Sequence, residues 1–426
     1  LGEQIAACHR HDIRVPVYIS VGLDEYSARE HPDWVEIGPD GRRHGAAPLQ
    51  AGWKKMCLNN PEYVQYVADQ TQEVLETLDG DGIWYDIISQ GECCCRYCLE
   101  GMLAAGLDPE QSADRKQFAA QVLLNLKRRL TPLVWGLRPG TILFWNAGHV
   151  GPNTVRFARQ LGQDYLGMTG KFHKSWADFG GFKTKEALEL ECFNMLATGA
   201  KCCVGDQLHP SGRITPATYD LIGAVYESVQ AKEPWCEGAK AVTEIGVFTP
   251  ELLETVPHGS ITIDDSLHGA YRMLIESHQQ FDVLDEHCDL SPYKVLILPD
   301  KITLTPEFAR KLEDYVAAGG SLILSHRSGT RAGADEFALG GVGARILGEA
   351  EYSPDFVVAS PAIAAGIPAS EHVMYERGLA VALAGGEALA EVWDPYFNRT
   401  YQHFCSHFHT PVDKASGRPG IVKSGR

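Results

Sequence analysis

Short apolar runs alternate with longer segments of helical periodicity through the first half of the chain. The runs end in polar or aromatic residues, which is typical of strands buried on both faces of a parallel sheet. They lie at residues 14–21, 82–88, 141–146, 165–169 and 201–206. Apolar residues at helical spacing predict helices at residues 61–78, 113–132, 154–161, 184–199 and 216–231, the second of them ending at Pro132.

This alternation of strand and helix predicts a parallel α/β fold, a TIM (β/α)8-type barrel whose strand ends form one rim. A complete barrel has eight strands, so we expect residues 1–238 to form an incomplete or irregular barrel that lacks its N-terminal strands. The chain begins at Leu1 inside a helical pattern, so we expect its natural N-terminus to lie further upstream. The short spacing after Trp145 also indicates that a barrel unit near residues 152–155 is irregular or missing.

A different pattern begins near residue 239. Strands are predicted at residues 244–248, 281–284, 294–298 and 321–325, with helices at 269–279 and 305–318 between them. This pattern predicts a doubly wound α/β domain over residues 239–347. The strand ends of this domain lack a G-x-G-x-x-G phosphate loop, so we do not expect it to bind a cofactor. Short β-type runs then predict a small β-rich region over residues 348–426.

Composition narrows the possible partners. The formal net charge of −17, without any block of Lys or Arg, argues against binding to nucleic acid or to an anionic membrane surface. No apolar run approaches the roughly 18–20 residues that a membrane span needs. The 12 cysteines are clustered or scattered rather than regularly spaced, which favours free thiols in a reducing cytoplasm.

The run at residues 82–88 is apolar except for Asp86. Hiding a carboxylate at the end of a buried strand is costly unless the group is paired or used. Catalytic groups of parallel α/β barrels lie at such strand ends. Asp86 is therefore a candidate catalytic residue, and a capping or salt-bridged aspartate is the alternative.

Cysteines cluster directly after this strand. Cys93, Cys95 and Cys98 lie within six residues, and Cys57 ends the preceding loop. Four thiols from two segments can enclose one tetrahedral metal ion, while the alternative is a set of reduced, inert cysteines. We expect the intervening Cys94 to point away from such an ion.

Two sets of motifs resemble known families. Residues 57–61, the strand at 82–86 and the cysteine spacing resemble bacterial glycoside hydrolases in which a flavodoxin-like, β-galactosidase-type trimerisation domain follows the barrel. The Gly-bounded segments 170–181 and 205–210 resemble the α-L-fucosidases of glycoside hydrolase family 151, which are related to family 29. The resemblance covers essentially the whole chain.

The resemblance implies a retaining exo-α-L-fucosidase that removes terminal fucose from glycans in the bacterial cytoplasm. In that family Asp86 corresponds to the nucleophile. The four cysteines correspond to a structural zinc site of family 42 β-galactosidases, so zinc is expected there and no cofactor is expected for catalysis. The trimerisation domain implies a homo-oligomer, a trimer or a multiple of one.

A retaining glycosidase also needs an acid/base about 5–5.5 Å from its nucleophile. The candidates are Glu191, Asp206 and Glu92, each of which has an ordinary structural alternative. A fucose pocket should combine polar donors with an aromatic wall. Strand-end positions make substrate-binding candidates of Trp145, Asn146, His149, His173, Trp176 and His209.

Two rival functions stay open. One is a β-galactosidase-like glycosidase, which is disfavoured because those enzymes carry a Glu where this chain has Asp86. The other is a catalytically silent carbohydrate-binding or scaffold protein on the same fold. The aromatic and His-rich run at residues 393–409 is interpreted as a surface loop or as a segment that reaches an active site.

Overall fold

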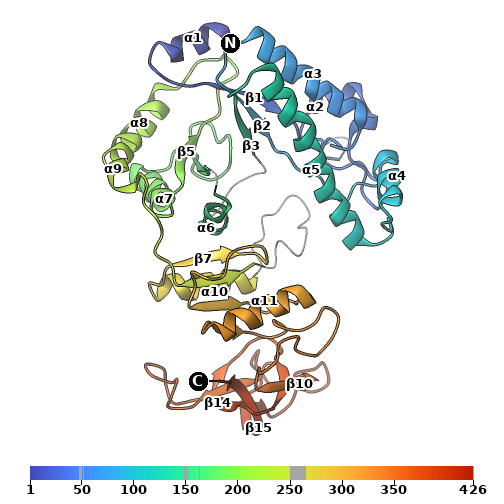
Figure 1. Ribbon diagram of the computed structural model, residues 1–426, viewed down its shortest axis with the longest axis vertical. Coiled ribbons are helices and arrows are strands. Elements are labelled where there is room, and N and C mark those ends of the chain that lie inside the picture. The colour runs from blue at the N-terminus through green and yellow to red at the C-terminus, as the bar shows by residue number, and fades with distance from the viewer. Residues whose placement is uncertain (48–49, 51, 147–151, 163, 250–264, 426) are drawn as a thin grey trace. The chain divides into compact units, whose positions relative to one another are not determined.

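The computed structural model describes residues 1–425 apart from 48–49, 51, 147–151, 163 and 250–264 (Figure 1). The described residues belong to two compact units. The first unit extends from Leu1 through strand β3, and the second contains the elements from helix α6 to the C-terminus.

A three-stranded parallel sheet lies at the centre of the first unit. Its strands follow the order β1 (Pro16–Ser20), β2 (Gly82–Asp86) and β3 (Ile142–Trp145). Helices α3 (Pro61–Thr77) and α5 (Ser112–Leu137) pack against each other beside the sheet (Figure 1). Their apolar faces join the strands in one core, so β2 is the central and best-covered strand.

Local sequence explains where α3 begins, and tertiary packing decides where α5 ends. The Asn60 side chain caps α3 by accepting from the backbone N–H groups of Glu62 and Tyr63. The expected break of α5 at Pro132 is wrong, because the helix continues to Leu137. Proline removes one helical hydrogen bond, but Leu130 and Val134 are both fully buried, so packing on either side holds the helix together.

The long excursion between β1 and α3 is compact. It contains α2 (Glu25–Glu30) and the 3₁₀ turn Pro32–Trp34. Isolated antiparallel bridges, among them Val35 with Met56 and Leu23 with Lys55, fold it back on itself. The remaining helices of this unit are α1 (Gly2–His9) and α4 (Arg96–Ala104).

The second unit begins with two further parallel strands, β4 (Leu166–Gly170) and β5 (Lys201–Gly205). Helices α7 (Lys185–Ala197) and α8 (Pro216–Gln230) pack together around Leu188 and Val225. Shorter helices lie at α6 (Pro152–Ala158), η2 (Arg159–Leu161) and α9 (Glu233–Cys236). The strands β1 to β5 thus alternate with helices as expected and fit a partial TIM-like fold, while the residues described here do not show a closed barrel.

A doubly wound parallel sheet follows. Its parallel strands lie in the order β7 (Phe281–Leu284), β6 (Ile245–Phe248), β8 (Val295–Leu298) and β9 (Ser321–Leu324). Helix α10 (Asp265–Glu276) shares a core with Val247, and helix α11 (Pro306–Ala317) shares another with Phe248. Because successive strand residues point to opposite faces, the two helices cover opposite faces of the sheet.

The last part of the chain is antiparallel β structure. Strands β10 (Ala344–Glu349) and β13 (Leu379–Leu383) form one pair. A second sheet has the order β12 (His372–Val373), β11 (Phe356–Ala359), β14 (Glu387–Pro395) and β15 (Val412–Lys423). Among the described helices, none has the length and apolar character to cross a membrane.

Candidate active site and cysteine cluster

Asp86 is the last residue of the central strand β2, and its side chain is half-buried. Strand residues alternate between faces, so Asp86 shares a face with Trp84, while Tyr85 lies on the face covered by helices. On β1, Tyr18 is in register with Trp84. The ring of Trp84 packs on Phe144 of β3, with centroids 5.0 Å apart, so the Asp86 carboxylate stands beside an aromatic wall.

Three neutral donors orient the Asp86 carboxylate. The Tyr18 hydroxyl donates to Oδ2 at 2.6 Å, while the Asn146 amide and the Trp84 indole N–H donate to Oδ1 at 2.5 and 3.2 Å. Partial desolvation of the hydroxyl, together with its hydrogen bond to Asp86, raises the pKa of Tyr18 well above its ordinary value, although the residue as a whole is 58% exposed. Tyr18 therefore keeps its proton and remains a donor. The carboxylate is oriented without being neutralised by any of these groups.

The backbone after Asp86 passes close to the segment that follows β1. Its carbonyl accepts from the N–H groups of Val21 and Gly22 at 3.1 and 3.3 Å. The next residue, Ile87, has φ +52°, a left-handed conformation that is unfavourable for a β-branched side chain. A Cβ on Gly22 would lie 1.7 Å from the Ile87 carbonyl oxygen, so the close approach requires glycine there. Backbone strain of this kind is found most often at functional sites.

Trp145, the last residue of β3, and Asn146, which follows it, point to different faces. Asn146 contacts Asp86, as described above. Trp145 packs on Tyr85 with ring centroids 4.7 Å apart, and the Lys127 ammonium of α5 lies 5.7 Å from its ring centre. Trp145 therefore belongs to the helix-covered face and is not brought together with Asp86. The third candidate from this segment, His149, lies outside the described residues.

An aromatic surface covers the ends of β4 and β5 in the second unit. Gly170 and Gly205 are paired in register at these ends. A Cβ on Gly205 would lie 2.2 Å from the Trp176 ring, so the indole lies directly over the glycines. The Trp176 ring contacts Phe172 edge-on at 5.1 Å and stays 44% exposed. The indole is therefore a half-covered aromatic surface at the ends of β4 and β5.

The other candidates from this part of the chain lie on the loops that follow β4 and β5. His209 contacts the Phe179 ring edge-on at 5.9 Å, and its Nδ1 lies 3.1 Å from the Ser211 hydroxyl. His173 is exposed. Both histidines therefore lie on the loops that follow β4 and β5, on the same rim as Trp176.

All three candidates for the acid/base are ion-paired. Glu191 on α7 binds the Lys183 ammonium through both oxygens at 2.8 Å. Asp206, which follows β5, lies 3.8 Å from the buried Lys171 ammonium. The Glu92 carboxylate accepts from Arg115 at 2.9 Å.

Lys171 itself is an unusual group, because it is only 3% exposed. Its ammonium lies 4.8 and 4.5 Å from the ring centres of Phe172 and Phe182, where cation–π attraction offsets part of the desolvation cost. Asp206 supplies the nearby negative charge. The pair places one carboxylate and one ammonium at the end of β5.

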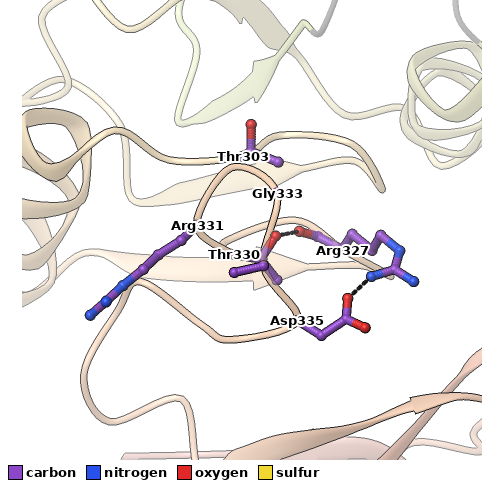
Figure 2. Close-up of a pocket in the computed structure, with 7 residues that line it drawn as sticks. Thr303, Arg327, Thr330, Arg331, Gly333 and Asp335 are labelled. Carbon is purple, nitrogen blue, oxygen red and sulfur yellow. Dashed lines mark hydrogen bonds and ion pairs between the residues drawn. The ribbon is translucent and has the colours of Figure 1, made fainter.

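A cavity of about 290 Å³ lies in the doubly wound domain, and none of the candidate residues lines it (Figure 2). Its lining comes from the loops after β8 and β9. Arg327 turns toward Asp335 and pairs with it, while Arg331 points in another direction (Figure 2). Since its cationic groups do not converge and include none of the candidates, this cavity is not the predicted sugar site.

The cysteine cluster has the geometry of a metal site. The Sγ atoms of Cys57, Cys93, Cys95 and Cys98 all lie within 4.8 Å of one another, and the residues are buried. Cys57 Sγ is 3.8, 3.5 and 3.6 Å from the other three. Tetrahedral Zn–S bonds of about 2.3 Å imply S···S separations of roughly 3.8 Å, whereas a disulfide bond measures about 2.05 Å.

The surroundings of the cluster also fit thiolate ligands. The backbone N–H groups of Ile37 and Cys95 each donate to Cys93 Sγ at 3.5 Å. Such outer donors commonly stabilise metal-bound thiolates. Cys94 points elsewhere, with its Sγ 3.7 Å from the carbonyl oxygen of Glu92. The four residues therefore fit a closed structural Cys₄ site, with no position open for a substrate.

A buried charged cluster lies next to the cysteines. Glu36 is fully buried and accepts from the Gly91 N–H at 2.8 Å and from His44 Nδ1 at 2.9 Å. The Lys55 ammonium is 3.4 Å away, and burial lowers the pKa of Lys55. Glu36 thus ties the excursion after β1 to the segment after Asp86, and sequence reasoning did not identify it.

Comparisons with known proteins agree with this architecture. Residues 1–87 match the family model described as hypothetical glycosyl hydrolase 6, and residues 253–361 match the β-galactosidase trimerisation domain. No match is found among curated proteins. Each model matches less than half of the chain.

Solved structures identify the family more narrowly. α-L-Fucosidase isoenzyme 2 from Paenibacillus thiaminolyticus is 37% identical, with a TM-score of 0.90 over 99% of this chain and 68% of that one. The chain therefore belongs to the same glycoside hydrolase family as this α-L-fucosidase, which confirms the resemblance seen in the sequence.

The β-galactosidases of Bacillus circulans sp. alkalophilus and Rahnella sp. R3 share the fold. They are 16% and 14% identical, with TM-scores of 0.71 and 0.72. Both matches cover 93% of this chain, and 75% and 74% of the respective β-galactosidases.

Proposed function

We propose that this protein is a retaining exo-α-L-fucosidase acting on terminal fucose of glycans, with Asp86 as its nucleophile. The observation that carries the proposal is the half-buried carboxylate at the end of β2, oriented by Tyr18, Trp84 and Asn146. The 37% identity to an α-L-fucosidase supports the substrate class.

In this mechanism Asp86 attacks the anomeric carbon of fucose while an acid protonates the departing glycosidic oxygen. A covalent glycosyl-enzyme forms, and water then displaces the carboxylate with net retention of configuration. Tyr18 and Asn146 hold the attacking oxygens in place, and the wall of Trp84 and Phe144 offers a surface for the apolar side of the sugar. Trp176, His173 and His209 are proposed to bind the sugar or the aglycone.

The acid/base is proposed to be one of Glu191, Asp206 and Glu92. Alanine variants of the three distinguish them with two substrates that differ in leaving group. Loss of the acid slows a fucoside with a poor leaving group far more than an activated aryl fucoside. A residue whose variant slows both substrates equally is not the acid.

Hydrolysis of aryl α-L-fucoside and aryl β-D-galactoside by wild type and Asp86→Asn tests the main proposal. We expect wild type to cleave only the fucoside and the variant to be inactive. Cleavage of the galactoside alone would favour the β-galactosidase-like alternative, which the shared trimerisation domain and fold keep open. Binding of fucose without hydrolysis of either substrate would favour a silent carbohydrate-binding protein.

We also propose that Cys57, Cys93, Cys95 and Cys98 hold a structural zinc ion, and that catalysis itself needs no cofactor. The metal would hold the segment after Asp86 against the excursion that follows β1. Metal analysis of wild type and Cys95→Ser tests this, with Cys94→Ser as the matched control. Equal zinc content in wild type and Cys95→Ser would contradict the proposal.

We also propose that the chain forms a homo-oligomer and that it is located in the bacterial cytoplasm. The match of residues 253–361 to a trimerisation domain supports a homo-oligomer. All 12 cysteines are free, which suits a reducing compartment. Sedimentation of the purified chain tests the first point, and fractionation of cells that express it tests the second.

A further inference from the structure

The loop between β14 and β15, residues 396–411, displays large aromatic side chains to solvent. The exposed fractions are 61% for Tyr396, 95% for Tyr401, 62% for Phe404 and 78% for Phe408. Single exposed aromatics are ordinary on protein surfaces, but a gathering within one short loop marks an interaction site.

The loop is held in shape although its rings are exposed. The Asn398 side chain accepts from the Ser353 N–H at 2.9 Å and donates to the Glu351 carbonyl at 2.7 Å. Phe397 stacks on His403 with ring centroids 3.7 Å apart. A preorganised loop loses less conformational entropy on binding than a flexible one, so this loop is suited to binding a partner.

The Arg399 guanidinium adds a cation to this surface. It lies 5.9 and 5.8 Å from the ring centres of Phe404 and Phe408. The loop contains Arg399 and three histidines but no Asp, Glu or Lys, whereas the whole chain has 55 acidic and 38 basic residues. Aromatic residues and Arg are enriched in protein interfaces, and Lys, Glu and Asp are depleted there.

We infer that this loop docks on an acidic surface of a second copy of the same chain. The inference rests on the self-association proposed above and names the surface that makes the contact. The excess of acidic residues elsewhere in the chain supplies the complementary charge. Asn398 is anchored to Glu351 and Ser353, and both of these residues lie inside the segment that matches the trimerisation domain. The loop therefore extends the surface of that domain.

The test is sedimentation of the full chain over a wide range of concentrations. The variants are Phe404→Ser combined with Phe408→Ser, and separately Arg399→Glu. The control is Trp235→Ser on α9, which removes an aromatic side chain that is also 78% exposed. Thermal melting of each variant establishes that it is folded.

We expect wild type to be oligomeric and each loop variant to raise the dissociation constant by about 10-fold or more. The control should associate like wild type. An oligomer that survives both loop variants unchanged would overturn the inference while leaving self-association intact, and a monomeric wild type would overturn both. Weaker binding of a fucosylated oligosaccharide in the loop variants, with unchanged association, would assign the loop to glycan instead. Hydrolysis of aryl fucoside reports independently on the proposed activity.

Discussion

Two aspartates on parallel strands, Asp86 of β2 and Asp282 of β7, have opposite surroundings. Asp282 is 4% exposed and pairs with the Arg159 guanidinium, whose Nε lies 2.5 Å from Oδ1. Its other oxygen accepts from the hydroxyls of Thr243 and Tyr293 at 2.6 and 3.0 Å. Asp86 is half-buried, and its three donors carry no charge.

The difference separates a structural carboxylate from a candidate nucleophile. The buried Arg159 neutralises Asp282, and the pair holds η2 to the edge of the doubly wound sheet. A neutralised and buried carboxylate has neither the free charge nor the access that attack on a sugar needs. The donors to Asp86 orient its carboxylate but leave it charged and accessible. The partners of a buried carboxylate are therefore more informative about its role than burial alone.

The largest expected effect is on activity. Asp86→Asn should lower kcat by about 10⁴-fold or more, the scale seen when an enzyme loses its nucleophile. Its melting temperature should stay close to that of wild type, because the amide is nearly isosteric. Asp282→Asn is the matched control: it also leaves Arg159 unpaired and loses stability, but the folded protein should keep most of the activity. Equal activity in Asp86→Asn and wild type would reverse the roles assigned to the two aspartates.

The second effect is on stability. Asp282→Ala should cost about 3–5 kcal/mol, since it leaves Arg159 as an uncompensated buried charge. Urea unfolding followed in the second unit measures this loss. Replacing both partners, with Asp282→Leu and Arg159→Met, should cost less than Asp282→Ala alone. If Asp282→Ala were as stable as wild type, the ion pair between Asp282 and Arg159 would make no contribution to stability.

A smaller effect is expected for the donor to Asp86. Tyr18→Phe removes one hydrogen bond to a carboxylate, worth roughly 1.5–3 kcal/mol, which corresponds to a 10- to 100-fold loss in kcat if the bond acts in the transition state. KM should change little. Tyr26→Phe, at another exposed tyrosine of the same unit, is the control. A rise in KM with unchanged kcat would instead assign Tyr18 to substrate binding.

The smallest effect concerns Asp81, just before β2. Its carboxylate accepts from the Val15 N–H at 2.7 Å and lies 2.9 Å from His9 Nε2. The Val15 hydrogen bond, followed by that of His9, lowers the pKa of Asp81. A lowered pKa contributes stability above the unfolded-state value near 4, and this contribution is lost as the pH falls through the folded-state pKa.

Asp81→Asn should therefore cost up to about 1 kcal/mol at pH 7, a limit set by solvent exposure of the pair. The difference from wild type should shrink as the pH falls below about 4. Urea unfolding at several pH values measures it. A difference that grows on acidification would contradict the sign of this contribution.

Much of the β1–β3 sheet and of the cysteine site follows from local sequence. The short aromatic and β-branched run at residues 82–86, which follows a glycine-rich turn, favours a buried strand, and the short spacing of Cys93, Cys95 and Cys98 keeps three sulfurs near one another. The helix cap at Asn60 is equally local. These features depend on neighbours in the chain, which is why the residues alone determine them.

The tertiary structure decided which face each strand residue uses and which partner each charge finds. Both faces of these strands are largely apolar, so the pattern could not place Asn146 beside Asp86 and Trp145 on the opposite face. Pairing of Glu191 with Lys183 and of Asp206 with Lys171 depends on how strands and helices pack. Such contacts join residues separated by many positions, and their formation is a property of the folded chain rather than of any one segment.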